Sequence, residues 1–303
     1  MNGIIILDKP EGFTSFDAVA VLRRLSKEKK IGHTGTLDPL ATGVLPLLLG
    51  RAAKALQFLP DTDKEYQASF RLGERRVTGD VTGTLVEESQ APVSPEALQA
   101  VLPAFRGEIL QVPPMYSAVS VNGKRLYQLA RKGIEVERQA RPVTVSRLEL
   151  LSYDPQTREG TLQVACSKGT YIRVLIEDMA KAAGSCGTMT ALRRTSACGF
   201  SQEDAHSLEA LKALAAEGRL EEALLPVEGL FALYPAVRVS PAQATRFQNG
   251  GSLDLCRLRQ APQEEGLCRV LSPKGSFLGL GTVDRQEGLL RFAKGFTEGE
   301  TAS

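Results

Sequence analysis

Residues 32–46, GHTGTLDPLATGVLP, surround one carboxylate, Asp38, with glycine, threonine, proline and small apolar residues. Glycine lets the backbone approach a bound ligand closely because no Cβ intrudes, and threonine offers a hydroxyl without adding charge. Such a loop can hold Asp38 in a tight, partly dry pocket, where a carboxylate acts as a nucleophile or general base. An aspartate before a proline is more often a structural turn residue, so the loop alone leaves both interpretations open.

Composition limits the kind of protein that can carry this loop. The chain has 303 residues, 24% of them charged, and a net charge of +2, which is ordinary for a globular protein of more than one domain. Five scattered cysteines without a CxxC pair and only two histidines argue against a zinc site. Reduced thiols, no signal peptide and no apolar run of membrane-spanning length lead us to expect a cytoplasmic protein.

The elements that must position Asp38 follow from apolar spacing. Strands are expected at 4–7, 64–73, 143–153 and 160–167, and helices at 16–25 (with Ser15 as the N-cap), 51–59, 95–104, 170–184 and 207–218. Beyond about Leu225, short strand-like runs alternate with Gly, Asn and Pro turns, which predicts a small all-β module after an α+β domain. We expect domains at 1–225 and 226–303, with an insertion at about 104–142.

Basic residues gather in that insertion. Tyr116 and Tyr127 lie beside six cations that outnumber two glutamates: Lys124, Arg125, Arg131, Lys132, Arg138 and Arg141. Cations with interleaved aromatic rings suit a phosphate backbone and unstacked bases. A charged run of this kind is more often a solvated helix face, so the stretch alone does not establish RNA binding.

The loop at 32–46 resembles the signature loop of the TruB family of tRNA pseudouridine synthases, whose aspartate is essential. Further segments resemble motifs of this family in the same order: 3–19, 64–73, 113–143, 166–180 and 191–200. The resemblance implies a catalytic domain with a central mixed, mostly antiparallel sheet flanked by helices. A small C-terminal β-barrel, similar to a PUA domain, would follow it. That last similarity is loose, and it leaves open whether the module binds the tRNA acceptor stem or only stabilises the protein.

The activity that the resemblance implies is isomerisation of uridine to pseudouridine at position 55 in the T-loop of tRNAs. The base is flipped out, and its bond to ribose is broken and re-formed through C5. No oxidation, hydrolysis or group donor is involved, so no cofactor and no metal are expected. Asp38 would attack C1′, attack the uracil ring at C6 or abstract a sugar proton, and the sequence does not choose among these routes.

By the same resemblance, Arg173 pairs with Asp38 and favours its charged form through a planar, two-pronged contact. Tyr66 stacks on the extruded uracil and can assist in removing the C5 proton, while Tyr171 and Leu192 line the pocket. Taken alone, Arg173 would be an exposed helix cation and the other three would be core residues.

Other residues would handle the RNA or support the loop. His33 would take the place of the flipped base in the stack, because extrusion costs a few kcal/mol that other contacts must offset. Asp80 would contact the substrate, and Lys9 and Pro10 would brace the catalytic loop. The proposed RNA-gripping residues are Lys124, Arg125, Arg131, Lys132 and Arg141.

Two segments depart from the family pattern. The family commonly has Thr-Asp-Thr-x-Asp-x-x-Gly where residues 76–83 of this chain read RVTGDVTG, so Asp80 and Gly83 remain but Val77 replaces the first acid. Thr188 and Met189 stand where many members have a histidine, which puts one peripheral RNA contact in doubt.

Three other interpretations agree less well with these residues. An RNA-binding or RNA-chaperone protein with a vestigial loop conflicts with the intact Asp38, Tyr66 and Arg173, and a glycosidase-like hydrolase expects a second carboxylate. Relatives that depend on a guide RNA are disfavoured because the insertion at 113–143 supplies its own RNA grip. We therefore expect a monomer that binds the tRNA T-arm, without a guide RNA, an obligate protein partner or a membrane.

Overall fold

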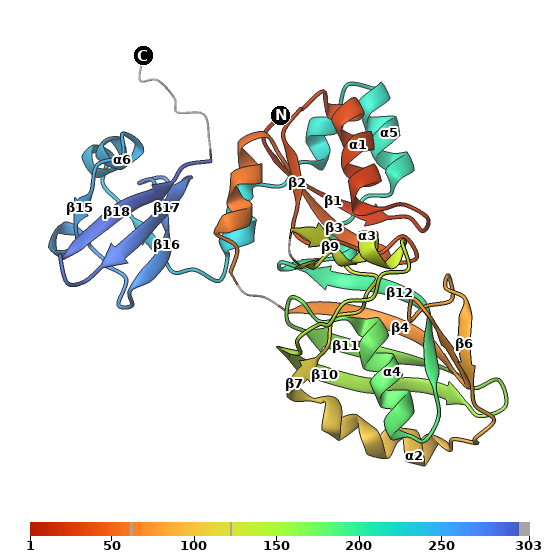
Figure 1. Ribbon diagram of the computed structural model, residues 1–303. Helices are drawn as coiled ribbons and strands as arrows, with labels where there is room; N and C mark the ends of the chain where they lie inside the picture. Colours follow the sequence, from red (N-terminus) through yellow and green to blue (C-terminus); the bar gives the residue numbers. More distant parts are fainter. Residues whose placement is uncertain (61–62, 122, 297–303) are drawn as a thin grey trace.

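The structure is a computed structural model that describes residues 1–60, 63–121 and 123–296 (Figure 1). Its centre is a nine-stranded sheet with the order β1-β3-β12-β4-β11-β10-β7, to which β2 and β13 add at β3 and β12. The strands are β1 (Gly3–Lys9), β2 (Ile31–His33), β3 (Thr42–Leu49), β4 (Lys64–Leu72), β7 (Gly107–Gln111), β10 (Arg141–Asp154), β11 (Glu159–Cys166), β12 (Gly187–Ala197) and β13 (Phe200–Ser201). Neighbouring strands run antiparallel except β3 and β12. The predicted mixed, mostly antiparallel sheet is confirmed.

Alternation along β1 divides the apolar interior into two parts. Ile5 and Leu7 belong to the main core, whereas Ile4 and Ile6 belong to a second apolar cluster, because successive side chains of a strand point to opposite faces. The helices that contribute to the main core are α1 (Ser15–Ser26), α2 (Pro95–Val101), α4 (Ile172–Ala182) and α5 (Leu208–Ala216). In Figure 1, α1 and α5 lie side by side, and α2 and α4 cover the other end of the sheet.

The prediction of Ser15 as the N-cap of α1 was wrong. Thr14, not Ser15, is the N-cap of α1, and it forms a capping box with Asp17. Ser15 is buried, and its hydroxyl instead accepts a hydrogen bond from the backbone N–H of Leu37, which lies in the catalytic loop. The segment predicted as a helix at 51–59 is a 3₁₀ segment, η1 (Gly50–Gln57).

The insertion contains little regular structure. After β7 it carries a small hairpin, β8 (Ser120–Val121) and β9 (Lys124–Arg125), and one short helix, α3 (Leu126–Ala130). A second hairpin, β5 (Glu74–Arg76) with β6 (Leu85–Glu88), follows β4. The turn between its strands contains most of the segment 76–83, in which the sequence departs from the family pattern. The turn of this second hairpin contacts Arg173 in the first turn of α4 (Ile172–Ala182).

The C-terminal module is a curled five-stranded sheet, in the order β14-β16-β17-β18-β15. Its strands are β14 (Ala236–Arg238), β15 (Leu253–Asp254), β16 (Gly266–Leu271), β17 (Phe277–Asp284) and β18 (Leu289–Lys294). The path is open, with β14 and β15 at its edges, so it forms half of a barrel. One helix was missed, α6 (Pro241–Gln248), although Ser240 before Pro241 gives the same start signal as Ser94 before Pro95.

Apolar contacts join this module to the first sheet. Leu280 and Phe296 belong to the same buried cluster as Ile4 and Phe231, and Phe231 and Phe296 have ring centroids 5.3 Å apart. Leu225 exchanges backbone hydrogen bonds with Ile4, so the chain is still attached to the first sheet at the predicted boundary. Among the described residues, no helix is both long enough and apolar enough to cross a membrane.

Candidate active site

The loop between β2 and β3 holds Asp38 by backbone contacts on both sides. The N–H of Leu37 donates to Ser15 Oγ at 2.9 Å, and the N–H of Gly12 donates to the carbonyl of Pro39 at 2.8 Å. The Asp38 side chain is 39% exposed, whereas Leu37 is buried. The loop therefore fixes the backbone at Asp38 while its carboxylate stays accessible to a ligand.

Arg173, in the first turn of α4, meets that carboxylate. Its Nη2 lies 3.0 Å from Asp38 Oδ2, and its Nε lies 3.9 Å from Asp80 Oδ2. Nη1 donates to the carbonyl of Thr78 at 2.6 Å, and Nη2 donates to that of Tyr116 at 2.9 Å. The Arg173 side chain is only 6% exposed, so these contacts hold a buried guanidinium in one orientation against Asp38.

A cavity of about 240 Å³ opens beside this pair. Asp38, Tyr66, Tyr171, Arg173 and Leu192 all line it, although they come from four separate segments of the chain. The volume is below the roughly 300–1,000 Å³ of drug-sized ligand sites, which suits a single nucleobase. Five of the residues expected at the site are thus brought together around one small cavity.

Burial sets the protonation of Tyr66. The residue is 8% exposed, and desolvation raises the pKa of its hydroxyl, an effect that the nearby charge of Arg194 opposes. The phenol is therefore neutral at physiological pH. Arg194 is itself completely buried, and it donates to the carbonyls of Val44 and Gly35 at 2.7 and 3.3 Å.

Tyr171 owes its place to an amide clamp. Gln111, at the end of β7 and 2% exposed, accepts a hydrogen bond from the Tyr171 N–H at 2.9 Å and donates to its carbonyl at 3.3 Å. The insertion is attached to the start of α4 by this pair, next to Arg173. No sequence pattern at Gln111 indicated the contact.

Lys64 also lines the cavity, and the sequence analysis did not single it out. Burial and the charge of Arg194 lower the pKa of its ammonium. Its Nζ lies against Gly35, where a Cβ would come within 2.9 Å of it. Within the described part of the chain, no hydrogen bond or ion pair is formed by this ammonium. Its position two residues before Tyr66 on β4 puts both side chains on one face, which is the signal that could have identified it.

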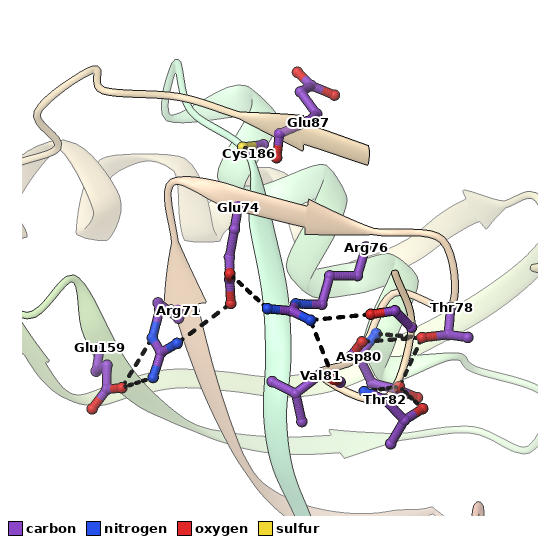
Figure 2. Close-up of polar contacts among 11 residues, drawn as sticks. Arg71, Glu74, Arg76, Thr78, Asp80, Val81, Thr82, Glu87, Glu159 and Cys186 are labelled. Atoms are coloured by element: carbon purple, nitrogen blue, oxygen red, sulfur yellow. Dashed lines mark hydrogen bonds and ion pairs between the residues drawn. The ribbon is translucent and has the colours of Figure 1, made fainter. Parts of the chain in front are cut away.

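Asp80 is buried and lies behind Arg173 rather than on the wall of the 240 Å³ cavity. Figure 2 shows its carboxylate inside a turn, where Oδ1 accepts from Thr78 Oγ1 at 2.8 Å and from Thr82 N and Oγ1 at 3.0 and 2.5 Å. The turn is joined to β12, because Val81 and Gly79 exchange backbone hydrogen bonds with Met189. Met189 is completely buried, so its side chain offers no surface contact to RNA.

Lys9 and Pro10, which the resemblance assigns to support of the loop, lie next to it. Lys9 is completely buried, and its Nζ donates to the carbonyls of Pro10, Phe13 and Pro39 at 2.9, 2.5 and 3.4 Å. Burial lowers the pKa of Lys9 from 10.5 to about 8, and the charge of Asp38 opposes the shift. Pro10 takes part through its carbonyl.

His33 ends β2 on the approach to the loop and is half-buried. Burial lowers the pKa of its imidazole, and the charge of Arg194 adds to this effect. The ring is therefore neutral at physiological pH. Its buried Nδ1 has no hydrogen-bond partner within the described residues. A neutral ring at a strand end suits stacking better than ion pairing.

The five basic residues proposed to grip RNA are all exposed: Lys124, Arg125, Arg131, Lys132 and Arg141. Arg131 lies over the ring of Tyr127, 5.5 Å from its centroid, and Arg125 donates to the carbonyl of Ala118. Ala118 and Ser117 line the catalytic cavity, so the basic insertion adjoins the site.

Two further basic grooves arise only in the folded chain. One, of about 690 Å³, is formed where η1 meets β2 and is lined by Arg23, Lys29, Lys30, Arg51 and Lys54. Another, of about 1060 Å³, lies on the C-terminal module and is lined by cations that include Arg238, Arg257 and Arg259. The first groove combines the basic run at 23–30 with Arg51 and Lys54, which are more than 20 residues away in the sequence, so the run alone did not indicate a groove. Pairing of Gly50 with Lys30 across β2 and β3 brings the first group together.

Solved structures share this fold. A Cbf5–Nop10–Gar1 complex contains a chain that is 27% identical, with a TM-score of 0.76 over 97% of this chain and 85% of that one. An H/ACA RNP bound to a substrate RNA containing 2′-deoxyuridine contains a chain that is 25% identical, with a TM-score of 0.75 over 98% of this chain and 86% of that one.

Sequence relatives are closer. The tRNA pseudouridine synthase B of Pseudomonas aeruginosa (strain UCBPP-PA14) is 44% identical over 93% of this chain and 92% of its own, and that of Azoarcus sp. (strain BH72) is 45% identical over 96% and 93%. Residues 23–172 match the TruB family pseudouridylate synthase N-terminal domain. Residues 173–232 match the tRNA pseudouridylate synthase B C-terminal domain, and residues 235–291 match the pseudouridine synthase II TruB C-terminal domain. With its aspartate, arginine and tyrosine around one small cavity, the chain belongs to the TruB family of pseudouridylate synthases.

Proposed function

We propose that this protein converts uridine to pseudouridine at position 55 in the T-loop of tRNAs. The observation that carries the proposal is the Asp38–Arg173 pair, at 3.0 Å, on the wall of a cavity the size of one nucleobase. The names of the relatives, tRNA pseudouridine synthase B, support the same substrate and reaction. The restriction to position 55 comes from the family to which the chain belongs.

The reaction is an isomerisation, so its atoms balance within the substrate. The N1–C1′ bond of the uridine breaks, the uracil turns, and a C5–C1′ bond forms; C5 then loses a proton and N1 gains one. Asp38 starts this sequence by attack on C1′, attack on C6 or removal of a sugar proton. Each route requires a carboxylate at the nucleotide, and Arg173 places a positive charge 3.0 Å from it. No cofactor enters this balance.

Tyr66 acts on the extruded base mainly by stacking. Because burial raises the pKa of its hydroxyl, the phenolate needed for a general base is scarce at neutral pH. The ring still offers a flat apolar surface inside the cavity. Any proton that leaves C5 toward Tyr66 must then pass through its hydroxyl as a relay, since a neutral phenol accepts a proton only as it donates its own.

Base extrusion needs compensation from contacts elsewhere. His33, neutral and at the end of β2, fills the space that the flipped base leaves in the stack, which offsets part of the few kcal/mol lost. Tyr171 and Leu192 enclose the base in the cavity. Asp80 contributes through Arg173, and Lys9 and Pro10 keep the loop in place from below.

The RNA backbone is held by the exposed cations of the insertion and the grooves. Lys124, Arg125, Arg131, Lys132 and Arg141 contact phosphates of the T-arm, and the basic groove of about 690 Å³ beside β2 provides a second surface for the backbone. The C-terminal module, which we place at 226–303 after a catalytic domain at 1–225, binds the acceptor stem through the groove that holds Arg238.

The protein works alone on its tRNA. The solved relatives come from a Cbf5–Nop10–Gar1 complex and an H/ACA RNP bound to a substrate RNA, but the relatives at 43–45% identity carry a tRNA enzyme name without partners. The insertion at 113–143 provides contacts that a guide would otherwise supply. We accordingly propose a monomer that needs neither guide RNA nor protein partner and acts in the cytoplasm, where tRNA is found.

The test is to incubate the protein with a T-arm RNA and map pseudouridine by position. Modification at the position that corresponds to residue 55, and at no other uridine, is the expected result. Asp38→Asn keeps the shape of the loop and removes the charge, so it should abolish product while the Kd for the RNA stays within about twofold, a difference below 0.5 kcal/mol. Turnover of Asp38→Asn close to that of the wild-type protein would remove Asp38 from its role.

A further inference from the structure

The turn at residues 76–83 determines how Arg173 meets Asp38. This turn supplies the carbonyl of Thr78, which accepts from Arg173 Nη1 at 2.6 Å, and the carboxylate of Asp80, 3.9 Å from Arg173 Nε. Nη2 of the same guanidinium faces Asp38. A planar guanidinium cannot shift one edge without moving the other, so displacement of the turn would disturb the Asp38 contact.

The turn cannot hold this shape through glycine and Asp80 alone. Asp80 ties Thr78 to Thr82 in its first half, and Gly79 permits a positive φ of +75°. The second half, from Val81 to Gly83, returns to the hairpin, and its carbonyls cannot bind the carboxylate of Asp80, which is itself an acceptor. Within the described residues, the amides of this half donate to Met189 and Asp80, with Gly83 N 3.2 Å from the Asp80 carbonyl, whereas the carbonyls of Val81 and Gly83 accept from Arg76.

Arg76 closes this second half. Its Nη1 donates to the carbonyl of Gly83 at 3.1 Å and reaches that of Val81 at 3.5 Å, and its Nη2 donates to Glu74 Oε2 at 3.1 Å (Figure 2). The Arg76 and Glu74 side chains are 26% and 16% exposed, which shields the pair from solvent screening. Glu74 thus holds the guanidinium in the orientation that fastens the turn.

Ion pairs connect Glu74 to the central sheet. Glu74 Oε1 lies 3.5 Å from Arg71 on β4, and Arg71 pairs with Glu159 on β11 at 2.6 Å. A chain of alternating charges therefore runs from β11 to the carbonyls behind Arg173. The outer pair of this chain is about half exposed and contributes little, so Arg76 and Glu74 are its effective members.

Arg76 lies in the segment where the sequence departs from the family pattern. Arg76 and Val77 occupy the positions of the common Thr-Asp, and the Val77 side chain is exposed and makes no polar contact. We propose that Arg76 is a positioning residue for the isomerisation: its contacts with Glu74, Val81 and Gly83 hold the turn that orients Arg173 against Asp38. This inference rests on the proposed function and adds Arg76 to its machinery.

The experiment compares Arg76→Ala with Arg75→Ala. Arg75 is adjacent on β5 and pairs with Glu87 at 2.8 Å, but both partners are about half exposed, and neither side chain has a described hydrogen bond to residues 77–83. Single-turnover rates at saturating T-arm RNA are measured with the Kd for that RNA and the midpoint of thermal unfolding. We expect Arg76→Ala to lower the rate about tenfold, equivalent to about 1.4 kcal/mol, with the Kd within twofold, and Arg75→Ala to stay within twofold in both.

Hydrogen–deuterium exchange supplies a readout that does not depend on activity. Amides from Val77 to Thr84 should exchange faster in Arg76→Ala than in Arg75→Ala, with no change in β11. Arg76→Lys keeps the charge but lacks the fork that joins Glu74 to two carbonyls, so its rate should fall by about threefold. It serves as the test variant if Arg76→Ala does not fold.

The proposal fails if the rate of the Arg76 variant stays within twofold of wild type. It also fails if the rate falls only in proportion to lost folded protein or lost RNA binding. Wild-type protein that forms no pseudouridine would instead contradict the proposed function, so the two failures are distinguishable.

Discussion

The ammonium of Lys9 on β1 reaches the backbone carbonyl of Pro39, the residue after Asp38, at 3.4 Å. The same ammonium donates to the carbonyls of Pro10 and Phe13, so one buried cation joins the strand to both sides of the catalytic loop. A buried ammonium with three carbonyl acceptors is fully used as a donor. Lys9 therefore supports the position of Asp38 without facing the substrate cavity.

Replacement of Lys9 by methionine should reduce turnover. Methionine fills a similar volume but donates to none of the three carbonyls, which would be left buried and unpaired. We expect the rate at saturating T-arm RNA to fall by at least tenfold, with the Kd for the RNA within about threefold, a difference below 1 kcal/mol. Lys212→Met, on the exposed surface of α5, is the control and should match wild type. Equal rates for the two variants would contradict a role for Lys9.

Lys9 also makes stability depend on pH. Its pKa in the folded protein is about 8, below the ordinary value of 10.5, so between these values the unfolded chain binds more protons than the folded one. Stability contributed by Lys9 therefore rises with pH across this window and is lost as pH falls toward 8. The unfolding midpoint of wild type minus that of Lys9→Met should increase between pH 8 and pH 10. A constant difference would show that the pKa of Lys9 is not lowered.

Gly79 is required for two separate reasons. Its φ is +75°, and an added Cβ would lie 3.1 Å from both Arg173 Cβ and Glu177 Oε1. Gly184, at the end of α4, has a φ of +81° with no atom within 4 Å of an added Cβ, so it matches the strain without the crowding. Each alanine variant should lose about 1–3 kcal/mol of stability. Only Gly79→Ala should also reduce turnover, by about tenfold, as measured in single-turnover assays below both unfolding midpoints.

Local patterns indicated the main strands and helices, whereas the residues of the cavity were indicated by the resemblance to the TruB family. Apolar alternation located β1 and β4, and the helical spacing from Ile172 to Met179 placed Arg173 in the first turn of α4. The same reasoning assigned the cap of α1 to Ser15, because Ser is on average the better cap than Thr and only packing shows that Ser15 is needed at Leu37.

Long-range polar contacts could not be predicted in this way. Gln111 and Tyr171 lie 60 residues apart, and nothing in either segment indicates that the glutamine binds both backbone groups of the tyrosine. Arg76 was seen only as a departure from a pattern, whereas its use depends on how the turn folds back onto it. Such contacts are specified by the register of the sheet, not by residue type.

Lys64 should contribute to substrate affinity. Its ammonium is on the wall of the catalytic cavity and forms no ion pair within the described residues, and its pKa is lowered by burial. An anionic group of the bound nucleotide would relieve this unfavourable burial. Lys64→Met should raise the Kd for T-arm RNA about tenfold, and Lys64→Arg should restore at least half of the lost binding free energy. Filter binding of both variants is the measurement, and an unchanged Kd for Lys64→Met would exclude the contact.

The basic insertion makes a prediction about salt. Lys124, Arg125 and Arg131 are exposed beside the residues that line the cavity, and each phosphate contact contributes about 0.7–0.9 to the slope of log Kd against log salt concentration. Reversal of all three charges to glutamate should weaken binding and lower that slope by about 2. Reversal of Arg219, which pairs with Glu217 and Glu222 near α5, should leave the slope unchanged. If the triple variant retained the wild-type slope, the insertion would be a solvated surface, and the phosphate contacts would have to lie in the groove of Arg23 and Lys54.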